Sequence, residues 1–122
     1  GTGRAFPWSV ELLSTPTVAA SGTQAASLST NHTLLTTTTS GVYVVCADLN
    51  ALALGERLIL TIAQKIRTGD TVRTLYKRLY KHPQACPIVQ SPPIVAPFGL
   101  DVTLRQEGGT GRSFPWSVDL IG

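Results

Sequence analysis

Methionine is absent from this sequence of 122 residues, and charged residues make up only 14% of it. An ordinary soluble domain carries roughly 25% charged residues, whereas here Thr, Ser, Val, Leu and Ala dominate. No apolar run approaches the roughly 20 residues that span a bilayer, and no signal peptide is visible at the start, so a transmembrane helix is excluded. Because Met is missing, we expect residue 1 not to be a translation start and the chain to be a processed product or part of a longer protein.

Groups that move protons near neutral pH are also scarce. There are two histidines, His32 and His82, both in polar surroundings that indicate loop or surface positions. The seven acids are dispersed without the close pairing or spacing of a metal site. The glycine-rich ends lack the Lys-Ser/Thr of a phosphate-binding loop. We therefore expect a protein that is not an enzyme, with no catalytic residue, metal, cofactor or small-molecule substrate.

Two cysteines, Cys46 and Cys86, lie 40 residues apart. A disulfide between them would contribute about 3 to 4 kcal/mol in the chain-entropy model. Cys46, however, lies in an apolar stretch where a free thiol packs as a small hydrophobe. Free thiols and a disulfide, within or between chains, both remain open from the sequence, with free thiols favoured.

Strand-like stretches separated by turn signals predict an all-β fold, an antiparallel β-sandwich of Ig-like or jelly-roll-like type with about 8 strands. The length suits one domain with a sizeable core. The expected strands are residues 6–13, 24–29, 32–38, 41–48, 56–68, 71–81, 87–90 or 94–96, 98–106 and 112–121.

Two of these stretches carry further detail. In residues 57–67 the apolar side chains of Leu58, Leu60, Ile62 and Ile66 alternate with polar ones, which indicates a half-buried strand. The apolar residues of 71–81 fit helical spacing better than they fit alternation, but strand propensity and the preceding Gly-Asp turn favour a strand. Residues 48–55 are expected to form a short helical turn or a loop, and five prolines make residues 82–97 an extended crossing segment or a sheet edge.

The two ends of the sequence repeat each other. Residues 1–13 recur as residues 109–121 at a constant offset of 108, with ten of 13 positions identical. We divide the chain into a duplicated terminal strand, residues 1–13, and a β-sandwich domain, residues 14–122. Three interpretations stay open: the leading copy is the last strand of a preceding tandem domain, a donor strand for a neighbouring protomer, or an equivalent strand in the same sandwich.

The repeated unit contains the aromatic residues most suited to anchor a strand. Phe6 and Trp8 in the leading copy correspond to Phe114 and Trp116 in the trailing one. Aromatic side chains carry large apolar area, so anchoring in a core is favoured over ligand binding.

Positive charge is concentrated in the middle of the chain. Seven of the ten basic residues fall between residues 57 and 81, where Asp70 is the single acid. These charges suit either an acidic partner or a solvated strand that resists edge-to-edge aggregation. The candidate partner-binding residues are Arg73, Lys77, Arg78 and Lys81; nucleic acid is a less favoured partner than protein because no nucleic-acid motif surrounds them.

One further pattern runs through residues 41–45, 48–58, 68–71, 101–106 and, most specifically, the terminal Gly-Thr-Gly-Arg-x-Phe-Pro-Trp at residues 109–116. Together these stretches resemble small β-rich structural proteins of tailed bacteriophages and prophages. It implies a virion component, such as a capsid decoration or stabilising subunit, with no catalytic residues to carry over.

The sequence therefore predicts a non-enzymatic virion structural protein on the surface of a phage particle. Its expected partners are copies of itself and a capsid or other virion protein, bound through many weak contacts, with no membrane partner. The alternative is a tandem β-sandwich repeat of a phage fibre or extracellular filament with an adhesive or receptor-binding role.

Overall fold

A computed structural model describes residues 3–10, 16–82 and 86–121 of the chain. The described residues form nine strands and no helix, which confirms the expected all-β class. The strands are β1 (Pro16–Ala25), β2 (His32–Thr37), β3 (Gly41–Asp48), β4 (Arg57–Gln64), β5 (Arg73–Lys81), β6 (Ile88–Gln90), β7 (Ile94–Ala96), β8 (Leu100–Glu107) and β9 (Ser113–Ile121).

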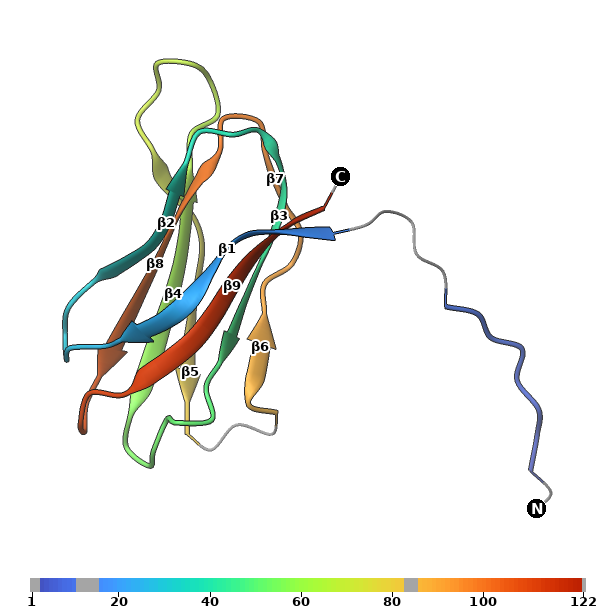
Figure 1. Cartoon of the computed structure of the whole chain (residues 1–122), viewed down its shortest axis with the longest axis horizontal. Coiled ribbons are helices and arrows are strands. Elements are labelled where there is room, and N and C mark those ends of the chain that lie inside the picture. The colour runs from blue at the N-terminus through green and yellow to red at the C-terminus, as the bar shows by residue number, and fades with distance from the viewer. Residues whose placement is uncertain (1–2, 11–15, 83–85, 122) are drawn as a thin grey trace.

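The strands make two antiparallel sheets that pack face to face as a β-sandwich (Figure 1). One sheet has the order β1-β9-β3-β6, with β7 also paired to β3. The other has the order β2-β8-β4-β5. Fully buried side chains from both sheets, among them Tyr43, Val45, Phe114, Leu60 and Val102, form one core between them. β9 is thus an interior strand, with neighbours on both sides.

Alternation of apolar and polar residues explains the strands that the sequence predicts best. In β4, Leu58, Leu60 and Ile62 are buried against the core while the residues between them are more exposed. The prediction fails for Ile66, which is largely exposed because β4 ends at Gln64 after a register shift between Ile62 and Ala63. The pleat no longer directs Ile66 toward the core.

The ambiguous stretch after this strand is a strand, as expected. β5 pairs with β4 along most of its length, from Arg57 opposite Lys81 to Gln64 opposite Arg73. β5 has no second neighbour among the described residues, so it forms one edge of its sheet. In the described part of the proline-rich segment that follows, two short strands, β6 and β7, lie on either side of Ser91-Pro92-Pro93.

The first strand differs from the sequence prediction. β1 begins at Pro16 and ends at Ala25, whereas a strand was expected over residues 24–29. Its sequence is rich in Ala, Ser, Thr and Gly, and most of its side chains are exposed. Such a strand is held by backbone hydrogen bonds to β9 and not by an apolar face, so hydrophobic alternation does not reveal it.

Residues 3–10, hereafter the leading segment, form no strand. They extend away from both sheets in Figure 1. The strand expected over residues 6–13 is therefore wrong for residues 6–10, and residues 11–13 lie outside the described residues. It follows that the two copies of the duplicated unit do not occupy equivalent strands of one sandwich.

Candidate functional site

The trailing copy of the duplicated unit enters the sandwich through a loop built around Glu56. The Glu56 side chain is only 2% exposed, yet it has several hydrogen-bond donors around it. The backbone amides of Ala53 and Thr110 donate to its two carboxylate oxygens at 2.8 and 3.0 Å. The Arg112 guanidinium adds an ion pair, with 3.2 Å between Nη2 and Oε2. Glu56 therefore fixes the start of β9 from the loop that leads into β4 of the opposite sheet.

These contacts determine the charge state of Glu56. Burial alone would raise the pKa of its carboxyl group. Hydrogen bonds from Arg112 and from the amides of Ala53 and Thr110 outweigh burial and hold the pKa below its ordinary value. At neutral pH Glu56 is consequently ionised, and both of its carboxylate oxygens accept hydrogen bonds.

Gln106 is the second buried polar anchor of the same loop. Its side-chain oxygen accepts a hydrogen bond from the Arg112 amide at 2.9 Å, and its Nε2 donates to the Thr110 carbonyl at 2.7 Å. Gly111 lies between these two residues, where an added Cβ would approach the Ala26 carbonyl oxygen to 2.4 Å. The loop accepts only glycine at this position without a backbone shift.

Once inside the sheet, β9 anchors the core as predicted for its aromatic residues. Phe114 and Val118 are completely buried, and Trp116 packs partly buried against the same core. The indole of Trp116 lies over Gly22 of β1, where an added Cβ would be in contact at 3.5 Å. We call the space between β1 and β3, together with the Glu56 and Gln106 contacts at its end, the β9 slot.

The leading segment carries the same side chains without these surroundings. Phe6, Trp8 and Val10 are 77%, 83% and 89% exposed. The prediction that Phe6 and Trp8 anchor a strand is therefore wrong for the sheets of this chain, because no sheet neighbour lies beside them. Anchoring in another copy stays a prediction. An extended segment with exposed apolar residues at every second position is typical of an unused strand face.

The four candidate basic residues lie on the predicted hairpin but do not share one face. Lys77 and Lys81 lie opposite Thr61 and Arg57, on the outer face of the sheet. Arg78 lies opposite the buried Leu60, so it belongs to the core-side face of this edge strand.

Arg78 and Arg73 have separate surroundings. The Arg78 guanidinium carbon is 5.5 Å from the centre of the Tyr80 ring. Arg73 pairs with Gln64 beyond the register shift, near the turn. Of the four, Lys77 and Lys81 are thus the two that share the outer face.

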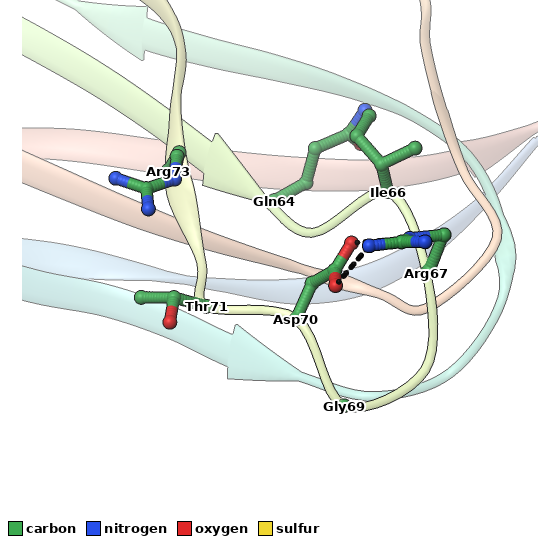
Figure 2. A pocket seen from close by; sticks show the side chains of 7 residues that line it. All are labelled: Gln64, Ile66, Arg67, Gly69, Asp70, Thr71 and Arg73. Atoms are coloured by element: carbon green, nitrogen blue, oxygen red, sulfur yellow. Dashed lines mark hydrogen bonds and ion pairs between the residues drawn. The ribbon is translucent and has the colours of Figure 1, made fainter.

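The turn of this hairpin encloses an open hollow of about 420 Å³ (Figure 2). Arg67 and Asp70 face each other across the turn, with 3.1 Å between Nε and Oδ2 and 3.2 Å between Nη2 and Oδ1. Arg73 and Gln64 line the hollow where it joins the strands. Since Asp70 neutralises Arg67, Arg73 is the remaining cation of this hollow.

A second hollow of about 450 Å³ lies on the outer face of the same sheet. Lys77 lines it together with Thr61, Thr103 and the ion pair of Arg105 with Glu107, whose Nε and Oε1 atoms are 2.5 Å apart. Arg105, with help from Ser29, lowers the pKa of Glu107. This face is a polar, threonine-rich surface of mixed charge.

Both cysteines are free, so a disulfide between Cys46 and Cys86 within the chain is wrong for this structure. Cys86 is exposed, whereas Cys46 is half-buried on β3, opposite Ser117 of β9. Burial, together with the nearby negative charge of Asp119, raises the pKa of the Cys46 thiol despite a hydrogen bond with Ser117. The Cys46 side chain is therefore a poor nucleophile, and Cys86 is the accessible thiol.

The histidine nearest this region has a structural role. His32 Nε2 accepts a hydrogen bond from the Ser27 amide at 3.0 Å, and Nδ1 lies 3.2 Å from Gln24 Nε2. It thereby links the end of β1 to the start of β2. Within residues 3–10, 16–82 and 86–121, no three His, Cys, Asp or Glu side chains gather as metal ligands.

Glu56 and Gln106 are the site residues that sequence reasoning missed. Glu56 was one of seven dispersed acids, and Gln106 belonged to an expected strand without a role. The one available signal was the repeated arginine, Arg4 and Arg112, in a chain with few charges. The repeat draws attention to Arg112, but the sequence does not say which acid lies beside it.

Comparison of the chain with protein-family models, curated proteins and solved structures gave no match. In the part of the chain that the structure describes, no helix has the length and apolar character to cross a membrane.

Proposed function

We propose that the chain is a non-enzymatic structural subunit of a virion, whose copies join to one another and to a capsid or other virion protein. The observation that carries this proposal is the exposed leading segment, a near-copy of an interior strand that presents Phe6, Trp8 and Val10 to solvent. Exposed apolar surface of this kind favours association. Many identical weak contacts then add up to a durable assembly.

The virion setting rests on the resemblance to structural proteins of tailed phages and on the basic hairpin. Lys77 and Lys81, on the outer face of β5, are the residues best placed to meet an acidic capsid surface. Arg78, on the core-side face, and Arg73, beside the turn, are less suited to the same flat contact. The proposed contact surface is therefore narrower than the four basic residues of the sequence prediction.

A fibre or filament of tandem sandwiches is the second candidate, and one observation favours it. The two copies of the duplicated unit are separated by 108 residues, about one complete sandwich. In a tandem array, each copy of the unit would close one sandwich and lead directly into the next.

Self-association of the full chain tests the structural role common to both settings. Analytical ultracentrifugation over a wide concentration range, with electron microscopy of the concentrated sample, should show oligomers or filaments. A chain that stays monomeric at every concentration would contradict the proposal.

For the decoration role, Lys77→Glu with Lys81→Glu should reduce binding to purified phage capsids, whereas Arg78→Glu should have a smaller effect. Equal binding by all variants would remove the hairpin from the contact.

A further inference from the structure

The leading segment has the side chains that the β9 slot requires, although that slot in its own chain is filled by residues 113–121. We propose that residues 3–10 of one copy form the β9 strand of a second copy, between the β1 and β3 strands of that copy. This inference rests on the structural role proposed above and names the contact through which copies join.

The loop at the start of the slot requires a glycine followed by an arginine, and the leading segment has both at the corresponding positions. Gly3 corresponds to Gly111, the position where a Cβ would meet the Ala26 carbonyl oxygen at 2.4 Å. In the leading segment itself nothing lies within 4 Å of an added Cβ at Gly3. The slot therefore requires glycine at this position, whereas the observed surroundings of Gly3 would accept a larger residue.

Arg4 corresponds to Arg112, which pairs with the buried carboxylate of Glu56. In a second copy, the Arg4 guanidinium would satisfy that copy's Glu56 in the same way. An anion buried to this degree needs a cationic partner, since its burial without one is costly. The slot thus distinguishes the correct strand by charge as well as by shape.

The core part of the slot requires large apolar residues at every second position. Phe6 and Val10 correspond to Phe114 and Val118, both completely buried, and Trp8 corresponds to Trp116 on Gly22. The three side chains would take the places of Phe114, Trp116 and Val118 of the second copy, so the slot buries the same apolar side chains with either segment.

The one difference between the two segments falls where the slot makes no demand. Residues 3–10 and 111–118 are identical at seven of eight positions, and the exception is Ala5 in place of Ser113. Ser113 is exposed at the start of β9. At each position where the slot restricts the side chain, the leading segment therefore has the same residue as β9 and the loop before it.

The chain geometry favours a second copy over the slot of the same chain. Pro16 pairs with Ile121 at the end of β9, and the residue that corresponds to Ile121 is Leu13. If the leading copy entered its own slot, only Ser14 and Thr15 would connect it to β1. Two-residue hairpins require positive φ angles, which favour Gly, Asn or Asp and disfavour a β-branched residue such as Thr.

A native cysteine supplies the test. Cys46 of β3 lies directly opposite Ser117 of β9, and Ser9 corresponds to Ser117. Residues paired in this way have Cα atoms about 4.5 to 5.5 Å apart, within disulfide range. In the proposed complex, Ser9→Cys of one copy lies against Cys46 of the other.

The donor is the full chain with Ser9→Cys, Cys46→Ser and Cys86→Ser, and the acceptor is the full chain with Cys86→Ser. Each has one cysteine, so a bond between positions 9 and 46 must join two copies. The two are mixed, partly unfolded in urea, refolded together and oxidised with copper phenanthroline. Peptide mapping then measures the bond between positions 9 and 46, and the matched control donor has Ala5→Cys in place of Ser9→Cys.

Two glycine variants bias the competition between the strands. In the acceptor, Gly111→Ala would place a Cβ against the Ala26 carbonyl oxygen and so weaken the binding of that chain's own β9. The yield of the bond between positions 9 and 46 should then increase roughly tenfold. Gly3→Ala in the donor should decrease the bond by a similar factor. The acceptor with native Gly111 is measured in parallel, so the result does not depend on the fold of the weakened variant.

The proposal is supported if Ser9→Cys links to Cys46 several-fold more than Ala5→Cys does and responds to both glycine variants. Equal linkage from positions 5 and 9 would overturn it. So would a chain carrying Ser9→Cys and native Cys46 that closes this bond within one monomer. Oligomers in the ultracentrifuge without the register-specific bond would remove this inference and leave the structural role standing, whereas a strictly monomeric chain would remove both.

Discussion

Arg112 and Glu56 form an ion pair across the two sheets of the sandwich, with 3.2 Å between Nη2 and Oε2. Glu56 immediately precedes β4, and Arg112 immediately precedes β9, so the pair joins the starts of strands in different sheets. The Arg112 side chain is partly exposed while the carboxylate is not. The contact therefore fixes where β9 begins, and its energetics depend on Glu56 remaining ionised.

Replacing Glu56 with Gln should destabilise the sandwich by about 1 to 3 kcal/mol at pH 7, because the charged hydrogen bonds to Arg112 and the Thr110 amide weaken. Urea unfolding at pH 7 measures this difference. Asp70→Asn is the matched control, since its ion pair with Arg67 is largely exposed and such pairs contribute little. A loss for Asp70→Asn as large as that for Glu56→Gln would contradict the assignment.

The same carboxylate gives the stability a defined pH dependence. The folded-state pKa of Glu56 lies below its unfolded value of roughly 4.3. Its contribution is therefore complete above that pH and is lost as the pH falls toward the folded-state pKa. Urea unfolding between neutral pH and pH 3 should show this loss in the native chain, and Glu56→Gln should show a smaller loss. Parallel pH profiles for the two chains would contradict it.

The strands that the sequence predicted well are those whose own residues alternate. β3 begins and ends where predicted, and Leu58, Leu60 and Ile62 face the core as their spacing requires. β1 was placed wrongly because its sequence is small and polar and its hydrogen bonds to β9 come from the other end of the chain. Local periodicity contains no information about such a partner.

The duplicated unit shows the same limit within one molecule. Residues 3–10 and 111–118 are nearly identical in sequence, yet one set lies outside the sheets and the other forms an interior strand. Strand propensity is the same for both, so it does not decide between them. The neighbours decide which copy becomes a strand: β1 and β3 flank β9, and Glu56 and Gln106 hold its start. Glu56 lies far from residue 112 in the sequence, and nothing in the sequence singled out Gln106.

Phe114→Ala should destabilise the sandwich by about 3 to 5 kcal/mol, because it leaves a cavity among completely buried side chains. Phe6→Ala, the same change at the corresponding position, should alter the unfolding free energy of the dilute chain by less than about 0.5 kcal/mol. Denaturant unfolding at low protein concentration measures both. Phe114→Leu provides a milder variant if the alanine chain does not fold.

Comparable losses at positions 6 and 114 in the dilute chain would mean that Phe6 also contacts a core within the monomer. That outcome would contradict the exposure of the leading segment.

Gly99 and Gly69 have similar positive φ angles, 80° and 85°, but different surroundings. A Cβ at Gly99 would approach the Thr37 carbonyl oxygen to 1.9 Å, whereas nothing lies within 4 Å of one at Gly69. Gly69→Ala should therefore cost about 1 kcal/mol from backbone strain alone, and Gly99→Ala should cost clearly more. Thermal unfolding followed by circular dichroism compares them, and an equal decrease in Tm would contradict the close approach of Thr37.

Labelling of the two thiols with Ellman's reagent at pH 8 should proceed in two phases. Cys86 is exposed and should react rapidly, whereas burial and Asp119 raise the pKa of Cys46 and keep its thiolate fraction low. Cys86→Ser should remove the fast phase and leave the slow one. Unfolding the chain in denaturant should make the two cysteines react at similar rates, because the burial and charge that protect Cys46 are then lost. Two thiols that react only after a reductant is added would show that both cysteines are held in disulfides, within or between chains, contrary to the free thiols of the structure.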